Sequence, residues 1–279
     1  MNSMAKSESS SRIVTSVVAV ISAAALAVSL IAAGFAACAV PDVSTKALAS
    51  AYSTDDASPF TKDELVAAAV QTKHYTIDDN DKAAVYATIA AINAQEALAG
   101  TAGKGAPKID ATANYAAGEL SGEQVAALET AFDAASERYV LTPDAVSHLD
   151  DVFGVVQAAK WWLLAAVVAA CVGCTATAFR GGKRLLGRVL AGAGVSVLAV
   201  FALLAAWVAI DFDGFFAQFH SLFFAAGTWT FSWDSLLICM YPPEFWVGMG
   251  AIWLVVTVAC CVVCITIGRL LRKGSTQKR

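Results

Sequence analysis

The sequence has 279 residues, 58% of them hydrophobic, with a mean hydropathy of +0.62 and a net charge of −4. That apolar content excludes an ordinary soluble domain and predicts an integral membrane protein. The charges are unevenly placed: residues 41–150 carry 17 acids and 7 bases, whereas every charge from Arg180 to Arg188 is basic. This split predicts that the two segments lie in different compartments, and we expect no nucleic-acid partner.

The chain begins with a polar stretch, residues 1–12, which we expect to be a cytoplasmic tail. Residues 13–40 follow as 28 positions without a charge and predict the first transmembrane helix. Because a secretory signal core spans only about 7–15 residues, we expect an uncleaved anchor. Phe35-Ala36-Ala37-Cys38 weakly resembles a lipidation motif. Lipidation of Cys38 is the less favoured reading, and the sequence leaves it open.

Residues 41–160 are polar, acidic and rich in alanine, which predicts an extracytoplasmic helical cap domain. Two residue pairs have the capping-box pattern that satisfies free amide groups at a helix start. The pairs are Thr61 with Glu64 and Ser121 with Gln124. Between them, residues 81–98 place apolar side chains on one helical face and predict a further helix. So much alanine predicts only a modest core within the cap itself.

Thr142-Pro143-Asp144 predicts another helix start, because it combines a cap residue, a proline in the first turn and an acid near the positive end of the helix dipole. The helix should run unbroken into a second transmembrane helix, residues 161–179, with a tryptophan pair at the interface. His148 then lies outside the hydrocarbon core. Asp144 and Asp151, at i−4 and i+3, could fix the tautomer of its imidazole or raise its pKa. A solvated histidine on an acidic helix would show the same pattern.

The remaining segments are assigned by charge and hydropathy. They are a basic cytoplasmic turn at 180–188, transmembrane helices at 189–210 and 247–268, and a cytoplasmic tail at 269–279. Basic residues follow the second and fourth helices and are absent from 211–246, so the positive-inside rule predicts that both termini face the cytoplasm. The predicted fold is an all-α membrane protein with four transmembrane helices. A small extracytoplasmic helical cap lies between the first two, and an aromatic segment, interfacial or re-entrant, between the last two.

Residues 211–246 are too aromatic for a solvated loop and, with four acids, too charged for a plain transmembrane helix. We expect one short helix to end at Gly227 and another to start at Ser232. Helical spacing predicts a face that sinks into acyl chains. The lipid-facing candidates are Phe216, Phe219, Phe223 and Phe224. His220 lies among them, where desolvation would lower its pKa and leave a neutral base. An aromatic girdle with an incidental histidine is the alternative.

Seven cysteines occur, four of them in two C-x-x-C pairs, Cys171 with Cys174 and Cys261 with Cys264. Such pairs invite a thiol-redox or metal reading. Both pairs, however, lie inside predicted transmembrane helices, where cysteine is most often a small apolar packing residue. We therefore expect no metal site and no cofactor.

The two histidine-containing segments resemble the bacterial lipoprotein intramolecular transacylases, a family of four-span membrane enzymes. The first block reads Phe219-His220-Ser221-Leu222-Phe223-Phe224, followed by Trp229, Asp234, Leu237-Ile238, Pro242 and Phe245. The second block is His148-Leu149-Asp150-Asp151-Val152. The sequence departs from the family pattern at Ala145, where a nearby glutamate is usual, and at Phe153, where a lysine is usual.

The resemblance implies transfer of the sn-2 acyl chain of a diacylglyceryl-cysteine lipoprotein to the α-amino group of that cysteine. It implies a site with His148 and His220 as catalytic residues, supported by Asp144, Asp151, Trp229 and Asp234. The expected partners are the lipoprotein N-terminus and the lipids of the cell membrane. No G-x-S-x-G, H-E-x-x-H or nucleotide-binding loop occurs, so direct aminolysis assisted by histidines is preferred to a serine acyl-enzyme.

Two other classes of function stay open. A thiol-redox membrane protein would use the C-x-x-C pairs, and a non-catalytic sensor or scaffold would use the acidic cap as a binding module. The expected site also raises a problem of height. His148 precedes Lys160 by twelve residues, so at about 1.5 Å per residue it would lie about 18 Å above a membrane boundary at Lys160. For the two histidines to meet, the 211–246 segment must rise, or the boundary must lie higher.

Overall fold

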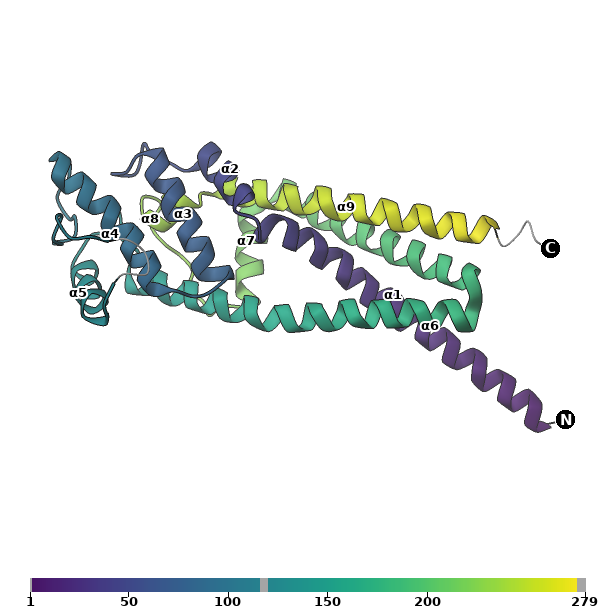
Figure 1. Cartoon of the computed structure of the whole chain (residues 1–279). Coiled ribbons are helices and arrows are strands. Elements are labelled where there is room, and N and C mark those ends of the chain that lie inside the picture. Colours follow the sequence, from purple (N-terminus) through teal and green to yellow (C-terminus); the bar gives the residue numbers. More distant parts are fainter. Residues whose placement is uncertain (1, 116–119, 275–279) are drawn as a thin grey trace. The chain divides into compact units, whose positions relative to one another are not determined.

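The computed structural model describes residues 2–115 and 120–274, with side chains from residue 11 onward, so the expected tails 1–12 and 269–279 fall partly outside it. The described residues form helices and no strand, which confirms the all-α prediction (Figure 1). The helices are α1 (Asn2–Ala39), α2 (Asp42–Tyr52), α3 (Lys62–Ile77), α4 (Lys82–Ala99), α5 (Gly122–Asp133), α6 (Pro143–Ile210), α7 (Phe212–Ser221), α8 (Leu236–Met240) and α9 (Pro243–Gly274).

The chain divides into two compact units. The first, which we call the spanning unit, comprises Met1–Ala37, Ala158–Phe215 and Ala251–Arg279. The second, the cap unit, comprises Cys38–Gln157 and Phe216–Gly250. Three helices of the described chain, α1, α6 and α9, are long and apolar enough to cross a membrane. Their apolar stretches make up the spanning unit.

A single glycine divides α6 into two helical arms. Gly182 has φ 70° and ψ 179°, a backbone conformation that residues with a Cβ atom rarely adopt. The residues on both sides of Gly182 are helical, so the basic segment 180–188 is a break at one residue and not the nine-residue turn expected from the sequence. Because lysine and arginine are good helix formers, the helix continues up to the break and resumes directly after it.

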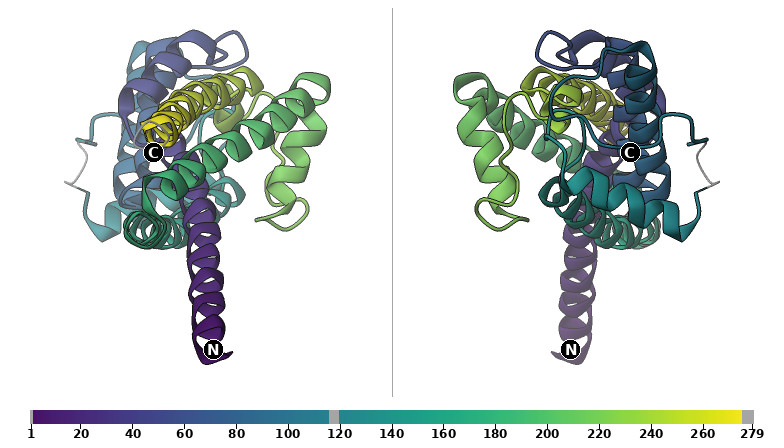
Figure 2. Two further views of the ribbon diagram at one scale, coloured as in Figure 1. Left: turned by 90° about the vertical axis from the view of Figure 1, so that its right-hand side faces the viewer. Right: turned by 90° about the vertical axis from the view of Figure 1, so that its left-hand side faces the viewer.

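Figure 2 shows the long helices of the spanning unit from their ends. They approach closely where small or polar side chains meet. The hydroxyls of Ser22 in α1 and Thr177 in α6 lie 3.3 Å apart, and the indole of Trp253 in α9 donates to the carbonyl of Ile31 at 2.9 Å. A Cβ atom at Gly187 would lie 2.5 Å from the carbonyl oxygen of Gly268. Close backbone approach of this kind is how transmembrane helices associate without a hydrophobic driving force.

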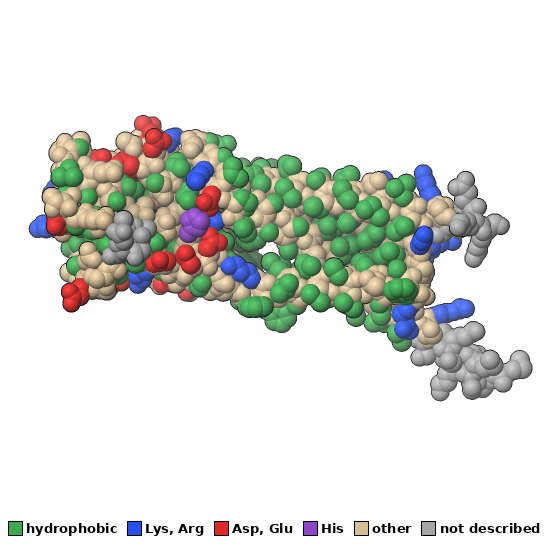
Figure 3. Space-filling view, viewed as in Figure 1, with side chains coloured by type: hydrophobic (Ala, Val, Ile, Leu, Met, Phe, Trp, Pro, Cys, Tyr) green, Lys and Arg blue, Asp and Glu red, His purple; other side chains and the backbone are tan. Residues whose placement is uncertain are grey.

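The surface of the spanning unit agrees with a membrane environment. On the face shown in Figure 3, apolar side chains cover its long helices, while Lys and Arg side chains gather near the α6 break and the end of α9. Exposed apolar side chains along these helices include Ile13, Val20, Val172, Leu203 and Val255. In water such a surface would be costly, whereas acyl chains cover it without penalty.

The helix starts predicted from the sequence of the cap unit are confirmed. Both predicted capping boxes form, at Thr61 with Glu64 and at Ser121 with Gln124. Asp81 caps α4, and Gly100 ends it with a φ of 73°. These bonds satisfy amide groups that the first turn of a helix leaves free.

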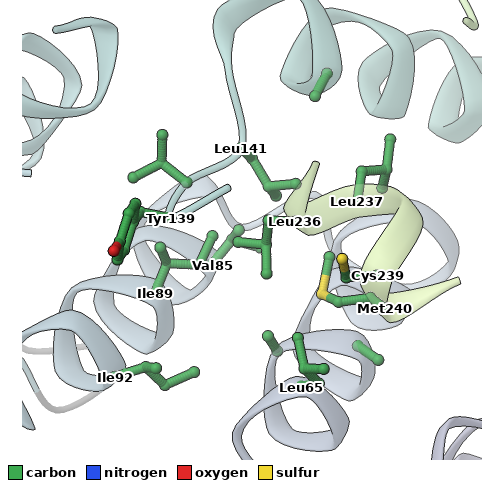
Figure 4. Close-up of a cluster of buried hydrophobic side chains, with 14 of the residues drawn as sticks. Leu65, Val85, Ile89, Ile92, Tyr139, Leu141, Leu236, Leu237, Cys239 and Met240 are labelled. Atoms are coloured by element: carbon green, nitrogen blue, oxygen red, sulfur yellow. The ribbon is translucent and has the colours of Figure 1, made fainter. Parts of the chain in front are cut away.

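The core of the cap unit is larger than its alanine content suggested. Buried side chains from α3, α4 and the segment before α6 meet those of α8, as Figure 4 shows. The labelled residues are Leu65, Val85, Ile89, Ile92, Tyr139, Leu141, Leu236, Leu237, Cys239 and Met240. The amide of Leu236 donates to the carbonyl of Glu137 at 2.7 Å. The second half of the 211–246 segment is therefore part of the cap core, and its short helix starts at a Ser235 cap and not at Ser232.

Candidate functional site

His148 lies in the second turn of α6, inside the cap unit. Its position follows from the helix start, where the Thr142 hydroxyl accepts a hydrogen bond from the amide of Ala145 at 3.3 Å. The histidine is only 8% exposed, although Asp150 and Asp151, which follow it closely in the helix, are exposed to solvent. Its ring lies 4.8 Å from that of Phe224 and 5.7 Å from that of Phe231, measured between centroids.

His220 lies near the end of α7 and has a defined tautomer. Its Nδ1 lies 2.8 Å from the carbonyl oxygen of Phe216, one helical turn earlier. A carbonyl oxygen only accepts hydrogen bonds, so Nδ1 carries the proton. In the neutral ring the lone pair is then on Nε2, which is able to accept a proton from a bound molecule.

The two histidine rings belong to one aromatic cluster, which we define as His148, His220, Phe216, Phe219, Phe224, Trp229 and Phe231. The centroids of His148 and His220 are 6.2 Å apart, with an angle of 30° between the ring planes. The centroid of His220 lies 4.0 Å from that of Phe216, 4.9 Å from Trp229 and 5.8 Å from Phe219. Residues from α6, from α7 and from the turn segment after α7, residues 222–234, thus surround the two imidazoles with aromatic rings.

Burial in this cluster lowers the pKa of both histidines. For His148, burial and the neighbouring His220 lower the pKa from 6.5 to about 4, against a smaller opposing effect of Asp151. For His220, burial lowers the pKa, and the hydrogen bond to Phe216 opposes this only in part. Both side chains are therefore neutral at pH 7.

Of the acids expected to support the histidines, Asp151 acts on His148 only through its charge, which raises the pKa of the imidazole. Asp144 and Asp151 are exposed, and His148 Nδ1 has no hydrogen-bond partner in the described part of the chain, so neither carboxylate fixes that nitrogen. Asp234 instead lies 3.5 Å from the guanidinium of Arg138, whose Nη2 also donates to the carbonyl of Ala57 at 2.9 Å. Asp234 thus helps to hold the turn segment against the rest of the cap unit.

The four phenylalanines expected to face lipid divide into two pairs. Phe219 and Phe223 are 43% and 48% exposed. Phe216 and Phe224 are half-buried, and both lie against His220. Phe219 also lies 5.8 Å from His220 between ring centroids, and the lipid contact of these phenylalanines stays a prediction.

Two residues near the histidines carried no signal in the sequence. Phe231 contacts His148 but looks like any apolar residue in a turn. Arg138 is an isolated base in an acidic stretch, and only the fold brings it to Asp234. Within residues 2–115 and 120–274, no group of three or more His, Cys, Asp or Glu side chains is arranged to hold a metal ion.

The chain is similar to a known protein family in the region that contains this cluster. The family model of the lipoprotein intramolecular transacylase Lit matches residues 110–246, which include both histidines of the aromatic cluster. No curated protein sequence matches the chain.

The fold is similar to that of the membrane integral lipoprotein intramolecular transacylase of Bacillus cereus. One crystal structure of that protein has 15% sequence identity and a TM-score of 0.62, covering 95% of this chain and 98% of that chain. Two more, of variants with a histidine replaced by alanine or by arginine, each have 15% identity and a TM-score of 0.61. They cover 99% and 100% of this chain, and 100% and 99% of theirs. The chain therefore has the fold of a multi-pass membrane protein.

We predict that both clustered histidines titrate below pH 6.5. The cluster favours the neutral forms of both rings. Its contribution to the stability of the folded protein is therefore complete above pH 6.5, the pKa of an unfolded histidine, and is lost as the pH falls toward about 4, the pKa of His148 in the fold. Nitrogen-15 spectra of histidine-labelled protein test this directly, because the chain has only 3 histidines and His74→Gln leaves two to assign. Titration of either ring above pH 6.5 would contradict the prediction.

Proposed function

We propose that this chain, which the family model of the lipoprotein intramolecular transacylase Lit matches over residues 110–246, moves the sn-2 acyl chain of a diacylglyceryl-cysteine lipoprotein to the α-amino group of the same cysteine. The product would be a lyso-form lipoprotein. The observation that supports the proposal most is the pair of neutral imidazoles, 6.2 Å apart, within the aromatic cluster. An acyl transfer between an amine and an ester needs a proton acceptor and a proton donor at one place.

The proton transfers follow from the tautomer of His220. The substrate amine, with a pKa near about 8, must be neutral before it attacks the ester carbonyl. As the N–C bond forms, His220 Nε2 accepts a proton from the attacking nitrogen. As the C–O bond breaks, the glyceryl oxygen takes a proton from a protonated imidazole. His148 lies within the same cluster, so the two histidines act as one acid/base unit.

The burial of the site suits an intramolecular reaction. Amine and ester belong to one molecule, so the enzyme has only to hold a cyclic geometry of about eight atoms, and such proximity lowers the barrier strongly. His148 is 8% exposed, so little water reaches its imidazole to hydrolyse the ester in competition. The exposed side chains of Phe219 and Phe223 would face the acyl chains of the lipid.

We propose four transmembrane segments with both termini in the cytoplasm. The two arms of α6 on either side of Gly182 would supply the second and third segments, and α1 and α9 the first and fourth. The basic side chains near the α6 break and the end of α9 favour the cytoplasmic side for that end. The cap unit, which contains the aromatic cluster, would then be extracytoplasmic.

Both clustered histidines should be needed for activity. His148→Ala and His220→Ala should each lower formation of the lyso-form by at least about 100-fold, because each removes part of one acid/base unit. The double variant should be little worse than either single variant. Mass spectrometry of lipopeptides from cells that express each variant measures the product.

The third histidine supplies the control. His74 hydrogen-bonds to Asp78 at 2.6 Å, outside the aromatic cluster, so His74→Gln should keep normal activity. Near-normal lyso-form from a folded His148→Ala or His220→Ala variant would remove that histidine from the site. Full activity in both would favour a sensor or scaffold.

The C-x-x-C cysteines should be dispensable. These four cysteines form no disulfide and lie within α6 and α9. Replacing Cys171, Cys174, Cys261 and Cys264 together by alanine should leave lyso-form production close to normal. Loss of activity at normal expression would instead support the thiol-redox alternative.

Labelling with a membrane-impermeant thiol reagent tests the orientation. A cysteine at Lys104 should react from outside the cell, and one at Lys273 only after lysis; both positions are exposed. The neighbouring Gly103 is unsuitable, because a Cβ atom there would lie 2.6 Å from the hydroxyl of Tyr139. The reverse pattern of labelling would invert the proposed topology.

A further inference from the structure

Two buried polar atoms in the aromatic cluster have no hydrogen-bond partner. Among the described residues, four buried side-chain atoms lack one: Asn93 Oδ1, His148 Nδ1, Trp229 Nε1 and Thr257 Oγ1. A buried unpaired donor is rare, because it loses its hydrogen bond to water and no hydrogen bond within the protein offsets that loss. Two of the four, on His148 and Trp229, lie beside His220. This concentration at one place calls for a functional explanation.

Trp229 is the clearer case, because an indole nitrogen can only donate. Two other indoles in the chain are satisfied: Trp246 donates to the carbonyl of Tyr241 at 3.1 Å, and Trp253 to that of Ile31 at 2.9 Å. The ring of Trp229 lies 4.9 Å from that of His220, with 32° between the planes. The unused N–H is thus held next to the ring whose Nε2 carries a lone pair.

We propose that Trp229 is a catalytic residue whose indole N–H binds the carbonyl oxygen of the ester and stabilises its oxyanion. The assignment rests on the proposed function. When the amine attacks, the carbonyl carbon becomes tetrahedral, the carbonyl oxygen takes the negative charge, and the amine proton passes to His220. Collapse restores the carbonyl, breaks the C–O bond and returns the proton to the glyceryl oxygen. Trp229 donates a hydrogen bond throughout and is unchanged at the end.

The geometry and the surroundings support this role. A base and an oxyanion donor must flank one carbonyl carbon, each about 3 Å from the atom that it serves. The rings of His220 and Trp229, with centroids 4.9 Å apart, are close enough for both groups to reach one bound ester. A donor held ready in an apolar site acts without the cost of reorganising water, which makes it effective at the transition state.

The test compares tryptophan variants in purified enzyme with a synthetic diacylglyceryl lipopeptide. Trp229→Phe removes the N–H and should lower kcat by about 100-fold with little change in KM, as loss of one oxyanion donor does. The pH profile should keep its shape, because no titrating group is removed. Trp229→Phe should not lower thermal stability by breaking a hydrogen bond, because the N–H that it removes has no partner.

Two matched controls separate this role from a structural one. Trp246→Phe removes an indole whose N–H is paired, so it should lower thermal stability. Trp233→Phe changes a 73% exposed ring and should leave both activity and stability unaltered. If phenylalanine leaves too large a gap at position 229, benzothienylalanine keeps the bicyclic shape and replaces the N–H by sulfur. It should give the same loss of kcat.

The same assay separates a failure of the Trp229 assignment from a failure of the proposed function. Wild-type enzyme and His220→Ala are measured in the same assay. If the wild type forms no lyso-form product, the proposed function itself fails. If the wild type is active, His220→Ala is inactive, and the benzothienylalanine variant keeps the wild-type kcat, then only the role of Trp229 is overturned.

Discussion

The rest of the site depends on one constraint: a buried imidazole, His148, and a half-buried one, His220, lie in one aromatic cluster without a hydrogen bond to any carboxylate of the described residues. Both rings favour the neutral form at pH 7, because burial lowers the pKa of both and each would repel the charge of the other. The aromatic side chains that cause the burial come from α6, α7 and the following turns. The fold must therefore bring these elements together without admitting water or an acid to the rings.

The cap core performs this task. Leu236, Leu237, Cys239 and Met240 are buried among side chains of α3 and α4, and the pair of Asp234 with Arg138 holds the turn segment just before them. This packing also answers the problem of height. Residues 216–250 belong to the same compact unit as His148, so the segment that bears His220 meets the first histidine within the cap.

Local features could be predicted and long-range ones could not. The capping boxes, the start of α6 and the grouping of His220 with phenylalanines all depend on spacing within one element, which the sequence displays directly. Arg138 and Phe231 are brought to the site by packing between distant segments, and no local pattern marks them. The acids near His148 were predicted as supports from spacing alone. Spacing shows that side chains share a helical face, but not that one of them turns away into water.

The low pKa of the histidines also limits what they can do alone. A weak base removes a proton from an amine with a small driving force, so general base catalysis by His220 is modest by itself. The reaction then has to depend on the proximity of amine and ester and on stabilisation of the charge that develops on the carbonyl oxygen. The same aromatic burial that weakens the bases strengthens a hydrogen bond to that oxyanion, because the surrounding dielectric is low. A neutral donor such as the Trp229 indole is the kind of group that such a site can hold without introducing a charge.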